Sequence, residues 1–115
     1  GKTLVDNSNS GMNIISVTKS LAYASTLQIK KKGRIIMVLG EEAAQVCEGL
    51  SPDDVSGFLR QQGENIDELV LVGERMHAVK HKNAHYADSL SQGLSIASGI
   101  AGDTDLILSC VKCFR

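Results

Sequence analysis

The chain alternates between short apolar runs and segments of helical periodicity. Residues 34–39 and 68–72 are nearly continuous apolar runs rich in branched side chains, and a glycine follows each of them. Such runs are typical of strands that are buried on both faces of a parallel sheet. Shorter runs at residues 3–5 and 105–108 predict two more strands, and residues 85–87 predict a fifth, very short one.

The segments between these runs predict helices. Apolar residues recur at helical spacing from Ile14 to the lysines before Gly33, with Ser20 and Gln28 expected on the polar face. Ser51, followed by a proline, is a strong helix start, because serine caps a helix and proline fits its first turn. Further helices are predicted at residues 51–62, 74–79 and 89–101.

The alternation of strands and helices predicts an α/β fold. We expect a three-layer, Rossmann-like domain with a mostly parallel sheet of five to six strands and right-handed crossovers. Residues 1–115 form a single domain, and residues 41–50 are expected to be a loop that carries at most a short helix.

Composition narrows the possible partners. The net charge is -1 with mixed signs, which gives no electrostatic case for nucleic acid or for an anionic membrane surface. No apolar run approaches the roughly 20 residues that span a bilayer, and no signal peptide opens the chain. A cytoplasmic protein is expected, and its three cysteines are expected to be reduced thiols.

The polar residues after the strands mark a candidate site. In open parallel sheets, ligands bind beyond the carboxyl ends of the strands. That edge gathers the loop after the first strand and three further polar segments, namely residues 6–10, 40–42, 73–75 and 109–115. Asp6, one residue past an apolar strand, is equally consistent with a binding residue and with a local cap.

Two other patterns have simpler explanations than a metal site. Cys110 and Cys113 have the CxxC spacing, but no second ligand pair accompanies them. His77, His81 and His85 recur every four residues among polar neighbours, which indicates a solvated surface. No metal site is therefore predicted.

Gly1-Lys2-Thr3 imitates the end of a phosphate-binding P-loop. A true P-loop needs two glycines separated by four residues before the lysine, and a helix after it, whereas a strand follows here. The ATP-binding machinery of an ATPase is therefore not expected within this chain.

Three segments resemble the C-terminal domain of the Mur ligases, the ATP-dependent amide-bond ligases of peptidoglycan synthesis. They are GKTLVDNSNSGMN, GRIIMVLGEE and GDTDLILSCVKCFR, and ELVLVG and HYADSL fall where that family has its third strand and the elements after it. The resemblance implies a domain that closes on a central ATPase domain and helps to bind the substrate. The reaction it implies activates a carboxylate as an acyl phosphate, which an amine then attacks.

The resemblance also implies site residues. On the nucleotide side of the cleft it places Asp6, Asn7 and Asn9. In the loop after the second strand it places Gly40 and Glu41, and in a substrate-facing loop after the last strand it places Ser109 and Lys112. None of them is expected to be catalytic. ATP and Mg²⁺ would be bound mainly by the central domain, so the expected partners are the N-terminal and central ligase domains and a small-molecule substrate.

Three positions depart from the Mur pattern in the opening motif. Ser8 replaces an aromatic residue, Gly11 an asparagine and Met12 a proline. These departures suggest a specialised relative of the Mur ligases. The chain resembles one such branch, the Mur-like ligase of methanogenic archaea that builds their nickel-tetrapyrrole coenzyme. The alternatives are a free-standing flavodoxin-like or receiver-like module and a metal or tetrapyrrole carrier. A receiver would need an acidic partner beside Asp6, which the sequence lacks.

Overall fold

The computed structural model describes residues 2–42 and 50–113 and confirms the predicted α/β class. Five parallel strands form one sheet in the order β1-β5-β2-β3-β4. The strands are β1 (Thr3–Asp6), β2 (Ile35–Glu41), β3 (Glu68–Val72), β4 (Ala84–Ala87) and β5 (Leu106–Lys112). Most of the segment predicted as a loop at residues 41–50 lies outside the described residues.

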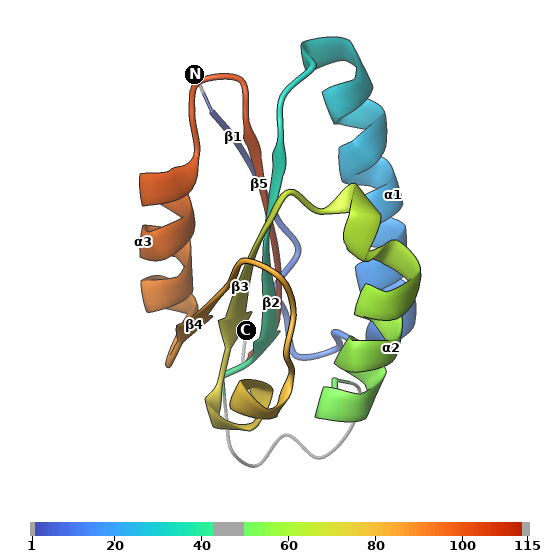
Figure 1. Cartoon of the computed structure of the whole chain (residues 1–115), viewed down its shortest axis with the longest axis vertical. Helices are drawn as coiled ribbons and strands as arrows, with labels where there is room; N and C mark the ends of the chain where they lie inside the picture. The colour runs from blue at the N-terminus through green and yellow to red at the C-terminus, as the bar shows by residue number, and fades with distance from the viewer. Residues whose placement is uncertain (1, 43–49, 114–115) are drawn as a thin grey trace.

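Helices cover both faces of the sheet. Helices α1 (Ile14–Lys31) and α2 (Pro52–Gln62) pack on one face and α3 (Leu90–Ile100) packs on the other (Figure 1). Two short 3-10 turns, η1 (Gly63–Asn65) and η2 (Glu74–Ala78), flank β3. Among the described residues, no helix combines the length and hydropathy needed to cross a bilayer.

Capping residues set the starts of two helices, one of which the sequence predicted. The side chain of Asn13 accepts hydrogen bonds from the amides of Ile15 and Ser16 at the start of α1. Ser51 accepts from the amide of Asp54 at the start of α2, and a proline occupies the first turn as expected. Each cap satisfies amides that have no partner within the helix, which fixes where the helix begins.

The alternation of side chains along the central strands divides the core into two layers. Met37 and Leu39 of β2 point toward α1 and α2, whereas Ile36 and Val38 point toward α3. All seven residues of β2 are buried, five of them in the predicted apolar run. The predicted position of Gly40 and Glu41, in a loop after this strand, is wrong, because β2 continues through Glu41. The sheet is therefore a rigid platform that fixes the positions of the loops at its two ends.

The prediction that Ser20 and Gln28 lie on the polar face of α1 is wrong, since both are buried. The Ser20 hydroxyl donates to the carbonyl oxygen of Ser16 at 2.8 Å, and Gln28 Nε2 donates to that of Arg34 at 2.7 Å. A polar side chain can face the core when its donors are satisfied in this way.

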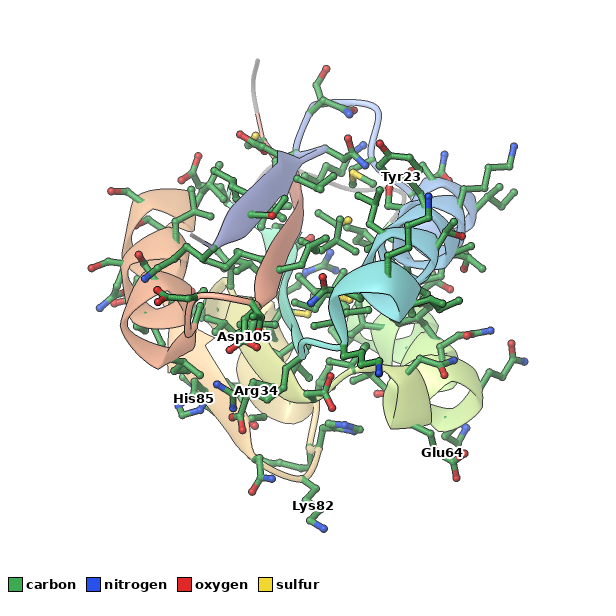
Figure 2. All side chains as sticks on the ribbon, turned by 90° about the horizontal axis from the view of Figure 1, so that it is seen from above. Tyr23, Arg34, Glu64, Lys82, His85 and Asp105 are labelled. Atoms are coloured by element: carbon green, nitrogen blue, oxygen red, sulfur yellow. The ribbon has the colours of Figure 1, made fainter. Side chains whose placement is uncertain are left out.

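Asp105 organises the amino end of the sheet. Its carboxylate accepts from the backbone amide of Gly102 at 2.7 Å and from that of Arg34 at 2.9 Å, and it pairs with the Arg34 guanidinium at 2.9 Å (Figure 2). These hydrogen bonds, led by that of Gly102, lower the pKa of Asp105 to about 2, against a desolvation that acts in the opposite direction. The ionised carboxylate therefore ties β5 to the residue that precedes β2.

We predict that Asp105 makes the fold sensitive to acid. Because its pKa is lower in the folded than in the unfolded chain, its contribution is complete above about pH 4 and is lost as the pH falls toward 2. Asp105→Asn should lower the free energy of unfolding by about 2 kcal/mol at pH 7 and flatten its pH dependence between 4 and 2. Urea unfolding across this range measures both effects, with the exposed Asp103→Asn as the control from the same turn. Equal acid sensitivity of wild type and Asp105→Asn would contradict the assignment.

Candidate functional site

The candidate site lies at the carboxyl edge of the sheet, where the loop after β1 meets the ends of the other strands. Because all five strands are parallel, their carboxyl ends share this edge. The amides of Asn7 and Glu42 donate to the carbonyl oxygens of Ser109 and Lys112, both at 2.9 Å. The ends of β1 and β2 are thus joined through β5.

Hydrogen bonds between residues close in sequence hold the loop after β1 in one shape. Asp6 Oδ1 accepts from the amide of Ser8 at 3.1 Å, and Asn9 Oδ1 accepts from the amide of Gly11 at 2.8 Å. Asn9 Nδ2 also donates to the carbonyl oxygen of Asn7 at 2.8 Å. The structure therefore gives the side chains of Asp6 and Asn9 local roles, while both residues stay exposed at this edge.

Ser8 anchors this loop in the interior. Its hydroxyl lies 2.6 Å from that of Ser109 and accepts a hydrogen bond from the amide of Val111 at 2.8 Å. Beside it, Asn7 Nδ2 donates to the hydroxyl of Ser20 at 2.8 Å. Sequence reasoning noted Ser8 only as a departure from a family pattern, and the pairing became visible only in the folded chain.

The predicted position of Ser109 and Lys112, in a loop after the last strand, is wrong. β5 continues through Lys112, and Ser109 is fully buried. The strand can continue past a serine because Ser8 satisfies its hydroxyl, and the next two residues, Cys110 and Val111, are apolar and buried. Ser109 is therefore a strand residue beneath the loop.

Lys112 fastens the loop from the last position of β5. Its ammonium donates to the carbonyl oxygen of Ser10 at 2.7 Å and to that of Met12 at 3.4 Å. Asn9 also forms an isolated parallel bridge with Lys112. Of the predicted site residues, Lys112 thus acts on the loop that carries Asn9, whereas Asp6, predicted in this loop, is the last residue of β1.

A second part of the site forms where β2 and β3 end. The Glu41 carboxylate is bound by two nitrogens of the Arg75 guanidinium, with Nη2 at 2.6 Å from Oε1. The Glu41 side chain is 6% exposed and that of Arg75 is 46% exposed, so a buried carboxylate presents a cation at the surface. The sequence placed residues 73–75 at this edge but assigned no role to Arg75.

Two glycines allow this pair to form. Gly40 has a φ of 149°, and a Cβ there would lie 2.1 Å from the carbonyl oxygen of Val72. Gly73 has a φ of 108°, and a Cβ there would lie 2.3 Å from the carbonyl oxygen of Glu41. The predicted site position Gly40 is therefore required by the close approach of the strand ends and offers no side chain to a ligand.

A cleft of about 380 Å³ lies beside this pair. Its lining includes the pair and three further carboxylates, those of Glu42, Glu74 and Asp88. Glu42 Oε2 also accepts from the amide of Leu90 at the start of α3, at 2.8 Å. Because Arg75 already balances Glu41, the remaining acids favour a group that is neutral or positively charged.

The histidines and cysteines occupy separate places. The ring of His77 stacks on Tyr86 with centroids 5.0 Å apart, and His85 lies 3.4 Å from Glu68. Cys110 and Cys113 belong to the core layers on opposite faces of the sheet, and burial raises the pKa of Cys110 to about 12. Within residues 2–42 and 50–113, no group of three potential ligands is positioned to hold a metal ion.

The apparent P-loop remnant does not lie at this edge. Thr3 begins β1, and the Lys2 ammonium donates to the carbonyl oxygen of Ser98, near the end of α3, at 2.7 Å. The lysine is therefore at the amino end of the sheet, away from the candidate site. Lys2 is therefore too far from the candidate site to bind a phosphate there.

Comparison with known proteins places this architecture in a family. The model of a family described as coenzyme F430 synthetase CfbE, C-terminal domain, matches residues 1–113. The chain is 58% identical, over 116 residues, to the coenzyme F(430) synthetase of Methanosarcina acetivorans. That match covers 100% of the chain and 25% of the relative, so the chain spans about a quarter of the relative's length. No solved structure matches the chain. The chain therefore belongs to the family of coenzyme F430 synthetase C-terminal domains.

Proposed function

We propose that this chain is the C-terminal domain of a Mur-type, ATP-dependent ligase that acts on a precursor of coenzyme F430. The observation that carries the proposal is the family match over residues 1–113, together with the 58% identical relative that is itself a synthetase. In this proposal the N-terminal and central domains of the full-length protein supply the ATPase, and this domain supplies cleft closure and substrate contacts.

The chemistry we propose begins at a carboxylate of the substrate. A carboxylate oxygen attacks the γ-phosphorus of ATP and ADP leaves. A nucleophile then attacks the carbonyl carbon of the resulting acyl phosphate, inorganic phosphate leaves, and the nucleophile loses a proton. When bound with Mg²⁺, ATP supplies the phosphoryl group and the metal supplies charge stabilisation. The task of this domain is to orient the reacting groups and to exclude water, because an acyl phosphate is readily hydrolysed.

The carboxyl edge of the sheet suits this task. Asp6 ends β1, and the loop after it, which carries Asn9, is fixed by its own hydrogen bonds and by Lys112. The exposed groups here therefore need little reordering when the domain closes. Among the described residues, however, the loop offers no phosphate cradle, because the Ser8 hydroxyl and the Asn9 amide are engaged internally. We therefore place the phosphates of ATP mainly on the central domain and assign Asp6 to the nucleotide side of the closed cleft.

We predict that the full-length synthetase forms an acyl phosphate. Incubated with ATP, Mg²⁺, the tetrapyrrole precursor and hydroxylamine, it should release ADP and yield a hydroxamate of the precursor, because hydroxylamine intercepts acyl phosphates. Mass spectrometry detects this product. ADP release with no hydroxamate under these conditions, while product still forms, would contradict carboxylate activation.

The same assay tests the nucleophile. The Mur resemblance implies an amine, so formation of the product should depend on an amine donor. If product forms at the full rate without hydroxylamine and in amine-free buffer, the nucleophile belongs to the precursor itself, and ligation to a separate amine is excluded even though carboxylate activation holds.

We predict that Asp6→Asn slows turnover without unfolding the protein. Asparagine keeps an oxygen that can accept from the amide of Ser8, so the loop shape should persist and only the charge is lost. ADP release by the full-length protein should fall at least about tenfold, which corresponds to about 1.4 kcal/mol of transition-state stabilisation.

The control removes an exposed acid at the opposite end of the sheet, Glu64→Gln (Figure 2). This variant should keep the wild-type rate. A wild-type rate for Asp6→Asn would exclude Asp6 from the site, and a matched fall in rate and melting temperature would assign Asp6 to the loop structure alone.

A further inference from the structure

A small groove opens at the amino end of the sheet, between the start of β1 and the last turns of α1. It has a volume of about 230 Å³ and an almost wholly apolar surface. Its lining residues are Thr3, Leu27, Gln28, Lys30 and Leu106. The groove is therefore remote from the carboxyl edge that carries the candidate site.

One polar atom in the wall of this groove lacks a partner. Gln28 is 5% exposed, and its Nε2 donates to the carbonyl oxygens of Arg34 at 2.7 Å and Thr104 at 3.1 Å. Turning the amide over would place an oxygen against both carbonyls, so the orientation is fixed by its neighbours. Oε1 is then a buried acceptor that no donor among the described residues reaches, and because the atom is closed to solvent it is not itself a docking contact.

An exposed aromatic side chain lies near the groove on α1, although it is not one of the lining residues. Tyr23 is 57% exposed and lies one helical turn before Leu27 on the same flank of α1. Figure 2 shows Tyr23 on the flank of α1 that faces away from α2. Ile29 is exposed on the other flank, because two residues along a helix turn it by about 200° from Leu27.

We propose that this groove docks the polypeptide that precedes this domain in the full-length synthetase. The docked segment would place an apolar side chain in the groove. The proposal rests on the proposed function. Since the family is a C-terminal domain and the chain covers 25% of the relative, about three quarters of the synthetase precedes it. The groove lies beside Thr3, where that polypeptide would enter β1.

Cysteine labelling in the full-length synthetase tests this docking. Lys30→Cys places a thiol at the rim of the groove, and Ile29→Cys places one on the neighbouring residue of the opposite flank; both positions are exposed in the isolated domain. With rates divided by those of each urea-unfolded variant, maleimide should label Lys30→Cys at least tenfold more slowly than Ile29→Cys. Adding Tyr23→Ser should speed labelling at Lys30→Cys and leave Ile29→Cys unchanged. The parent protein gives the background from native cysteines.

Each other result overturns the proposal. Equal labelling of the two variants would show that the groove is open in the full-length protein. Protection that rises with protein concentration would show that a second copy covers the groove instead. Labelling needs no turnover, so failure of carboxylate activation would remove the proposed function and leave this result readable.

Discussion

The last residues of β5 connect the loops at the carboxyl edge of the sheet. β5 lies between β1 and β2, and its register with β2 runs from Leu106 to Lys112 without a break. Its end supports both loops, because the amide of Asn7 donates to Ser109 and that of Glu42 donates to Lys112. Without the last residues of β5, both loops would lose these hydrogen bonds. The strand therefore places the site residues more than it contributes to the site.

This support explains how polar chemistry is arranged on an apolar platform. Ser8 and Ser109 share a buried hydroxyl contact, so the loop after β1 is tied down without a charged group in the core. Where β2 and β3 end, two nitrogens of Arg75 bind the buried Glu41 carboxylate and compensate its charge. In both parts of the site, the exposed groups lie at the carboxyl edge of the sheet and the groups that hold them in place are buried. Such preorganisation would suit the closure that we propose for this domain, because its loops would not have to refold.

The sequence predicted the fold well because the fold depends on local patterns. The apolar run of β3 and the serine-proline start of α2 gave those boundaries directly, since burial on both faces and helix capping act within a few residues. The site depended on distant partners. Ser109 was predicted to lie in a loop after the last strand because its partner, Ser8, lies 101 positions away. Gln28 was predicted to be exposed because the carbonyl oxygens of Arg34 and Thr104, which accept from its Nε2, come beside it only in the folded chain. Arg75 was missed because its partner, Glu41, ends one strand beside a glycine, whereas Arg75 follows the next strand and its glycine. Only the folded chain brings the acid and the base together.

A double-mutant cycle on Ser8 and Ser109 tests most directly whether β5 anchors the loop. The free energy of unfolding in urea would be measured for wild type, Ser8→Ala, Ser109→Ala and the double variant. Ser8→Ala should cost more than Ser109→Ala, because it also leaves the buried amide of Val111 without its acceptor. The account predicts a coupling energy of about 1 kcal/mol between the two hydroxyls. Strictly additive losses would show that the two side chains act independently and would contradict the anchoring role of β5.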